Sequence, residues 1–94
     1  MTNEKIMDTL CEILLYADVI KDGDKVTFGH NEDFGTIIIT GAGYDLAFHY
    51  GEDIYISLYY YDHGKLTEIV LDNYNHRRVF NLLYDLHGEW MNRF

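Results

Sequence analysis

Ile54-Tyr55-Ile56-Ser57-Leu58-Tyr59-Tyr60-Tyr61 is the longest alternating pattern in this chain. Successive side chains of a β-strand point to opposite faces of the sheet. One face of this strand therefore carries an apolar row, made of Ile54, Ile56, Leu58 and Tyr60. The opposite face carries the tyrosine row, made of Tyr55, Ser57, Tyr59 and Tyr61. We expect the apolar row to pack in the core and the tyrosine row to stay on the surface.

Four further strands are predicted by the same alternation and by the turn residues between them. Together with 54–61, the predicted strands cover residues 25–30, 36–40, 44–50 and 66–71. The connecting loops are short, so consecutive strands are expected to pair antiparallel. Which face each side chain of 66–71 takes stays open, because Ile69, Val70 and Leu71 are all apolar.

Two amphipathic helices flank the strands, since apolar residues recur every three or four positions over residues 4–21 and about 74–92. Gly23 is expected to end the first helix, and Asp72 or Asn73 to cap the second. Both helices need an apolar surface, which one face of the sheet supplies. We therefore predict an α+β fold: a two-layer sandwich with a five-stranded antiparallel meander between an N-terminal and a C-terminal helix, both helices on one face.

The charge restricts the kinds of partner that the chain can bind. Its 94 residues, expected to form one domain over 1–94, contain 16 Asp and Glu against seven Lys and Arg, a net charge of −9. This charge repels nucleic-acid phosphates and anionic membranes and attracts basic proteins. We expect a cytoplasmic protein without a nucleic-acid or membrane partner, although solubility alone would also explain the charge. The N-terminal residues lack the pattern of a secretory signal.

No residue pattern predicts a catalytic site, a metal site or a cofactor. The five histidines lack zinc-ligand spacing, and Cys11 is the single cysteine. Ser57, His49 and Asp45 have the residue types of a nucleophilic triad, but an open sheet face provides neither a cleft nor oxyanion donors. We therefore expect a non-enzymatic protein, and a pocket around His49 would favour the enzymatic alternative.

The tyrosine row and the acidic loops instead indicate protein binding, because tyrosine offers a large contact area with a polar tip. The predicted partner-binding residues are Tyr55, Tyr59 and Tyr61 of the tyrosine row, Asp45 and His49 of the neighbouring strand, and the loop acids Glu32, Asp33, Glu52, Asp53 and Asp62. Two other interpretations stay open. Tyrosines also stabilise strands by cross-strand contacts, and two copies could stack their tyrosine faces as a homodimer.

In size, charge and predicted architecture, the whole chain resembles the small acidic inhibitors made by phages and other mobile elements. These include anti-CRISPR proteins and the DNA-mimic inhibitors of uracil-DNA glycosylase or restriction enzymes. The resemblance implies an inhibitor that binds a basic, nucleic-acid-handling host protein in the host cytoplasm, with carboxylates in place of phosphates. It rests on no shared motif, so it transfers no functional residues. The alternative is a small cytoplasmic interaction or homo-oligomerisation module without mimicry.

Overall fold

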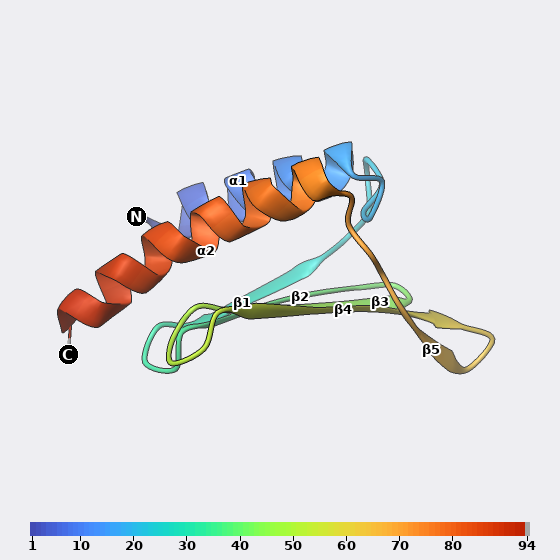
Figure 1. Cartoon of the computed structure of the whole chain (residues 1–94). Helices are drawn as coiled ribbons and strands as arrows, with labels where there is room; N and C mark the ends of the chain where they lie inside the picture. The colour runs from blue at the N-terminus through green and yellow to red at the C-terminus, as the bar shows by residue number, and fades with distance from the viewer. Residues whose placement is uncertain (94) are drawn as a thin grey trace.

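The computed structural model describes residues 1–93 and shows a five-stranded sheet, preceded and followed in the chain by one helix each (Figure 1). The elements are α1 (Asn3–Tyr16), β1 (Thr27–Asn31), β2 (Thr36–Gly41), β3 (Tyr44–His49), β4 (Tyr55–Asp62), β5 (Lys65–Glu68) and α2 (Asn73–Arg93). The strands lie in chain order across the sheet, and every pairing is antiparallel. The predicted α+β meander between two helices is confirmed.

Both helices contribute to a single hydrophobic core with one face of the sheet, and Figure 1 shows them on the same side of the strands. Their buried apolar side chains are Ile6, Leu10, Ile13 and Leu14 of α1, and Val79, Leu82, Leu83 and Leu86 of α2. The buried strand residues of the core are Ile37, Ile39, Tyr44, Leu46, Phe48 and Leu58. These strand residues alternate with outward-facing ones, so they share one face of the sheet.

The apolar row of β4 is buried only in its middle. Leu58 is 2 % exposed and Ile56 packs at the margin of the core, whereas Tyr60 is 39 % exposed. Tyr60 lies opposite Tyr44 in the register with β3 and therefore faces the helix layer, as predicted. It stays partly exposed because it lines a cavity at this end of the sheet instead of packing in the core.

The first helix ends at Tyr16, earlier than the predicted residue 21. Asp18 takes the left-handed backbone with φ of 60°, and the Val19 N–H donates to the Leu14 carbonyl at 2.9 Å. This is the geometry that usually ends a helix at glycine. Gly23 also has positive φ, but it lies within the connection to β1 and does not end the helix.

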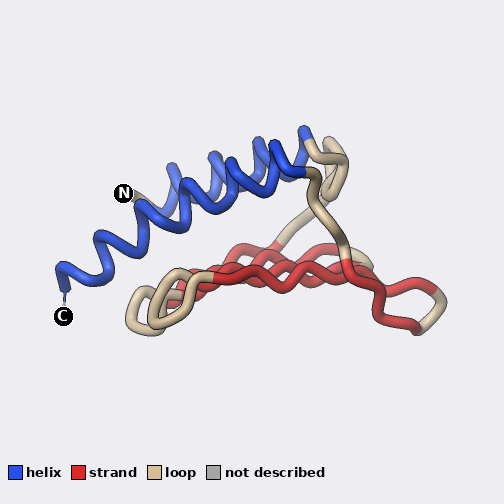
Figure 2. Tube along the Cα trace, in the orientation of Figure 1, coloured by secondary structure: helices blue, strands red, loops and turns tan. Residues whose placement is uncertain are grey.

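The fifth strand is shorter than predicted, and the chain then leaves the sheet as a strap, residues 69–72, which rises to the start of α2 (Figure 2). Ile69 and Leu71 pack against the core, while Val70 is 83 % exposed. Asp72 caps α2, because its Oδ1 accepts the Asn75 N–H at 2.8 Å. The structure therefore decides which side chains of residues 69–71 face the core: Ile69 and Leu71 do, and Val70 faces solvent.

Candidate protein-binding surface

The tyrosine row alternates along β4 with the core residue Leu58, so it lies on the face of the sheet opposite to the helix layer. Tyr55 and Tyr61 are 46 % and 52 % exposed, and Tyr59 between them is partly buried. Neither helix covers this face, so its tyrosines form a surface within the described part of the chain. We call it the open face.

Side chains of β3 and β4 contact one another in pairs across the open face. The rings of His49 and Tyr55 stack with their centroids 4.0 Å apart, and the Tyr61 hydroxyl donates to Asp45 Oδ2 at 2.7 Å. That hydrogen bond raises the pKa of Tyr61, and burial lowers the pKa of His49. Both groups are therefore uncharged at neutral pH, and Asp45 supplies the charge of these two pairs.

The same contacts keep apart the three residues of the alternative nucleophilic triad. Ser57 lies opposite Ala47 in the register, Asp45 accepts from Tyr61, and His49 stacks on Tyr55. A cavity does adjoin His49, but neither Ser57 nor Asp45 is among its lining residues. Within residues 1–93, no hydrogen-bond chain links Ser57, His49 and Asp45.

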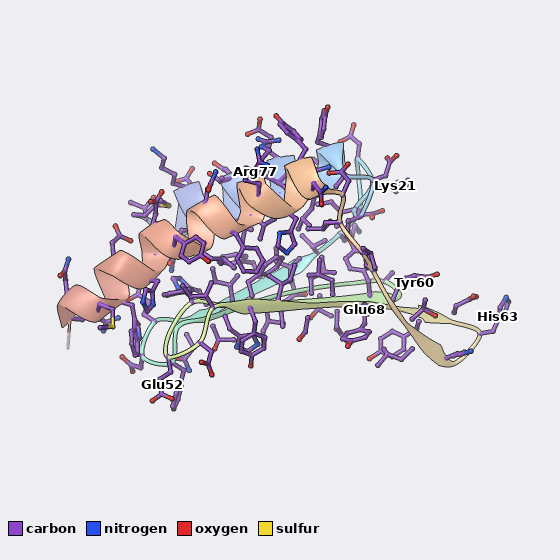
Figure 3. The ribbon with its side chains drawn as sticks, viewed as in Figure 1. Lys21, Glu52, Tyr60, His63, Glu68 and Arg77 are labelled. Carbon is purple, nitrogen blue, oxygen red and sulfur yellow. The ribbon has the colours of Figure 1, made fainter. Side chains whose placement is uncertain are left out.

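Four of the five predicted loop acids lie together at one end of the sheet. Glu32 and Asp33 belong to the β1–β2 loop, and Glu52 and Asp53 to the β3–β4 loop. Figure 1 shows these loops side by side at the end away from β5, and Figure 3 marks Glu52 there. We call these four residues the acidic tip. The fifth acid, Asp62, is the last residue of β4, at the opposite end of the sheet and next to the turn residue His63, which Figure 3 marks.

Two glycines bring the backbones of these loops into direct contact. A Cβ added to Gly35 would lie 2.5 Å from the Gly51 nitrogen, and one added to Gly51 would lie 2.5 Å from the Phe34 oxygen. The Tyr50 N–H donates to the Gly35 carbonyl at 2.8 Å, and His87 Nδ1 of α2 donates to the Tyr50 carbonyl at 2.9 Å. The two loops therefore form one unit. A side chain at Gly35 or Gly51 would prevent this close approach of the two backbones.

The end of α2 also holds the β1–β2 loop. The Trp90 indole N–H donates to the Asp33 carbonyl at 3.2 Å. The Arg93 guanidinium lies 3.3 Å from the Asp33 carboxylate and 3.7 Å from that of Glu32. These two acids are therefore partly neutralised. No ion pair of the other two tip acids is formed within the described part of the chain.

A partly buried hydrogen-bond chain runs beneath the tip from α1 to β3. His30 Nδ1 donates to Asn3 Oδ1 at 2.6 Å, and the Tyr50 hydroxyl donates to His30 Nε2 at 2.5 Å. Burial lowers the pKa of His30, against the opposing effect of Glu32. Burial and, to a lesser degree, Glu32 raise the pKa of Tyr50. Tyr50 therefore keeps its proton and His30 stays neutral, the states that this chain requires.

A cavity of about 560 Å³ opens where the acidic tip meets the tyrosine row. The acids Asp33, Glu52 and Asp53 and the aromatic residues Phe34, His49, Tyr55 and Trp90 line it. Phe34, one of these lining residues, is 76 % exposed, and the lining residues within 1–93 include no lysine or arginine. Carboxylates beside aromatic rings fit a guanidinium or an ammonium group, which pairs with the acids and stacks on the rings.

The charge is distributed unevenly between the two layers. Residues 26–64, which include β1 to β4 and their loops, contain none of the seven Lys and Arg residues. The same segment contains six carboxylates: Glu32, Asp33, Asp45, Glu52, Asp53 and Asp62. The cations lie in the helices, in the α1–β1 connection and in β5. The open face and the tip therefore present negative charge together.

Sequence reasoning missed Phe34, Trp90 and Arg93 as parts of this surface. Phe34 lies in a sequence typical of an ordinary turn, and Trp90 lies at a position where the helical periodicity predicts a core residue. Trp90 is 57 residues from Asp33 in the chain, so only the packing of α2 along the sheet brings them together. The single tryptophan at the end of an apolar stripe was the one available signal.

Comparison with protein-family models, curated proteins and solved structures finds no match to this chain. Neither helix of residues 1–93 combines the length and the apolar character needed to cross a membrane. The same residues contain no group of three or more His, Cys, Asp and Glu side chains that could hold a metal ion. The acidic tip and the open face are the candidate functional surfaces of the described residues.

Proposed function

We propose that this chain is a non-enzymatic inhibitor that binds a basic host protein and blocks its nucleic-acid site. The target class is a nucleic-acid-handling protein of host defence or DNA processing, in the host cytoplasm. One observation carries the proposal. The cation-free segment 26–64 joins an open face with tyrosines to a pair of acidic loops fixed by backbone contact.

The acidic tip supplies charge in a fixed arrangement. Contact between Gly35 and Gly51 orders the loops before any partner arrives, which reduces the entropy that binding would otherwise cost. Glu52 and Asp53 stay available to a partner's cations, since their loop receives no ion pair within the described residues. Negative charge on one face also steers a basic protein toward that face.

The cavity beside the tip provides the specific contact. A partner arginine that enters it would meet Glu52, Asp53 and Tyr55, which all line the cavity. Guanidinium groups that bind DNA phosphates are planar, stack on aromatic rings and pair with carboxylates in the same geometry. A protein that binds phosphates with arginine therefore fits this surface.

Capture from a bacterial lysate at low salt tests the proposal. The full chain should retain a basic protein, and a double-stranded DNA oligonucleotide should release it, because both compete for one site. The double variant Glu52→Lys/Asp53→Lys should weaken capture by about tenfold or more, since close charge pairs contribute strongly to such complexes.

Asp8→Lys/Asp85→Lys, on exposed positions of the two helices, is the matched control because it changes the net charge equally. It should keep most of the capture. Equal losses in both double variants would show that net charge alone acts. A captured partner that DNA does not release would contradict mimicry and leave a plain interaction module.

One observation favours homodimerisation as a second candidate. Ile38 is 46 % exposed in the middle of the open face, between Gly29 and Ala47 in the register. An exposed apolar residue on the same face as a row of tyrosines resembles the core of a protein interface. In that case Ile38→Asp should convert a dimer to a monomer in sedimentation analysis. A wild-type chain that sediments as a monomer at every concentration would exclude this candidate.

A further inference from the structure

The outer face of α2 carries a shallow groove of about 430 Å³ that takes no part in the proposed partner surface. Six residues line it: Asn73, His76, Arg77, Phe80, Asn81 and Tyr84. They recur at three- and four-residue steps, on the face of the helix opposite to the buried core residues Val79 and Leu83. The groove therefore faces away from the core, and we call these six residues the α2 groove.

One side of the α2 groove is a row of aromatic rings, each one helical turn from the next. The rings of His76 and Phe80 stack with their centroids 4.4 Å apart, and the centroids of Phe80 and Tyr84 lie 6.2 Å apart. Phe80 lies outside the hydrophobic core of the described chain, and Tyr84 is 58 % exposed. Aromatic side chains that the core does not use offer contact area to another molecule.

The other side of the α2 groove is polar and positively charged. Asn73, Arg77 and Asn81 form it at four-residue steps. Arg77 is exposed and forms no ion pair with the described residues, whereas Arg78 pairs with a glutamate of α1. The segment 73–84 contains no carboxylate, and the positive end of the helix dipole lies at its start. The groove therefore attracts negative charge.

The acidic tip has the complementary chemistry. Glu52 and Asp53 form no ion pair within residues 1–93, and Phe34, which lines the same cavity, is 76 % exposed. An exposed ring beside carboxylates matches a row of rings beside a guanidinium. Figure 3 marks Arg77 in the helix layer and Glu52 at the tip. No ion pair joins the two surfaces within the described chain, so their charges stay available to another copy.

A single-stranded nucleic acid is the other kind of ligand that stacks on rings and pairs with arginine. Its affinity depends on several cations along the backbone. Arg77 is the single Lys or Arg among the described residues that line the α2 groove, and the chain has a net charge of −9. An acidic protein surface needs only local complementarity, because physiological salt screens charges beyond about 8 Å. The observations therefore favour a protein ligand, and this chain itself supplies one.

We propose that the α2 groove of one copy of this chain binds the acidic tip of a second copy. Arg77 pairs with Glu52 or Asp53 of the second copy, and Phe34 of that copy packs on the rings of the groove. The two surfaces differ, so the contact is heterologous and produces open chains or rings instead of a two-fold dimer. The contact is small, and both copies carry net negative charge, so it is weak. It involves no host partner and does not depend on the inhibitor function.

Backbone-amide NMR of the purified full chain, at increasing protein concentration and physiological salt, tests the proposal. Shifts should grow with concentration at residues 33–35, 52–53 and 76–84, with an apparent Kd of about 1 mM. Lys65→Gln removes an exposed cation outside the groove and should leave these shifts unchanged. Absence of shifts at 76–84, or shifts confined to the open face, would overturn the proposal.

Two neutral variants at exposed positions separate the two surfaces. Arg77→Gln keeps the tip intact, and Glu52→Gln/Asp53→Asn keeps the groove intact. Each variant alone should associate about tenfold more weakly than the wild-type chain, because one side of the charge pair is missing.

Mixing the two variants should restore the contact. Isotope-labelled Glu52→Gln/Asp53→Asn protein should show shifts at 76–84 when unlabelled Arg77→Gln protein is added, since an intact groove then meets an intact tip. Addition of unlabelled Glu52→Gln/Asp53→Asn protein is the control and should give at most weak shifts there. A mixture that behaves like this control would refute the contact between groove and tip.

Discussion

The acidic tip and the β4–β5 hairpin lie at opposite ends of the sheet and are held in different ways (Figure 1). At the tip, Gly35 and Gly51 bring two loops into contact, and Trp90 donates a hydrogen bond to one of them. The hairpin is a short extension in which β5 pairs with β4 alone, and its turn residues are exposed. Carboxylates at the two ends therefore differ in how they are held: those at the tip lie on loops in backbone contact with one another, whereas Asp62 is the last residue of β4, beside an exposed turn.

The largest expected difference between the two ends comes from their glycines. Gly35 has φ of 65° and Gly64, in the hairpin turn, has φ of 80°. A Cβ at Gly35 meets the Gly51 backbone, whereas a Cβ at Gly64 meets nothing within 4 Å. Gly35→Ala should lower the free energy of unfolding by about 3 kcal/mol, because steric overlap is added to backbone strain. Gly64→Ala should lower it by about 1 kcal/mol, from strain alone.

Urea unfolding of both variants at one pH measures this difference. The Gly64→Ala protein is the internal control, since both substitutions place a β-carbon at positive φ. Equal losses of stability would show that the two loops of the tip can separate at little cost. The tip would then be no more rigid than the hairpin.

A smaller effect is expected from the support that α2 gives the tip. Trp90→Phe removes the indole N–H that binds the Asp33 carbonyl but keeps an aromatic ring. It should lower the free energy of unfolding by about 1 kcal/mol, the usual net value of one hydrogen bond. Hydrogen exchange of the amides at 33–35 should become faster, while exchange at 62–65 stays unchanged. Faster exchange at both ends would indicate a global effect instead.

Tyr84→Phe, on an exposed position of the same helix, is the control and should leave both the free energy of unfolding and the exchange rates unchanged.

The tip should also respond to pH through His30. Burial lowers the pKa of His30 in the folded protein below its ordinary value of 6.5, so protonation favours the unfolded chain. The stability that neutral His30 contributes is complete above pH 6.5 and is lost as the pH falls toward the folded-state pKa. The neutral His30 ring accepts a hydrogen bond from the Tyr50 hydroxyl and donates one to Asn3. Glu32 is the acidic group that opposes the lowering of the His30 pKa.

Chemical denaturation at a series of pH values between about 7.5 and 5.5 measures this effect, in a range where most carboxylates stay ionised. The wild-type protein should lose stability as the pH falls. His30→Gln should lose less, because glutamine does not titrate, and part of the dependence should remain because burial also lowers the pKa of His49. An unchanged pH dependence in His30→Gln would exclude His30 as its source.

The fold was largely predictable because alternation and turn residues are local signals. The first four strands begin and end within two residues of the predicted positions. The end of α1 was not predictable in the same way, because Asp18 adopts a backbone usually associated with glycine. The strap was read as strand because its apolar residues, Ile69 to Leu71, resemble one, although they connect two layers.

The candidate site was predictable in its residue types but not in its grouping. Asp45 and His49 were expected on the strand beside the tyrosine row, and the register confirms this, with Tyr55 opposite His49. The separation of Asp62 from the other loop acids follows from the direction of the strands, which the sequence already implied. The contacts of Trp90 and Arg93 with Asp33 depend on the angle at which α2 crosses the sheet, and no local pattern encodes that angle.

The strand order has a consequence for how the chain folds. Every strand pairs with its neighbour in sequence, so each pairing closes only a short loop and loses little chain entropy. The contacts of α2 with the β1–β2 loop instead join residues 57 and 60 positions apart. We expect the meander to form early, and α2 to dock on it when the C-terminal part of the chain has been synthesised. The acidic tip would then be the last region to reach its final shape.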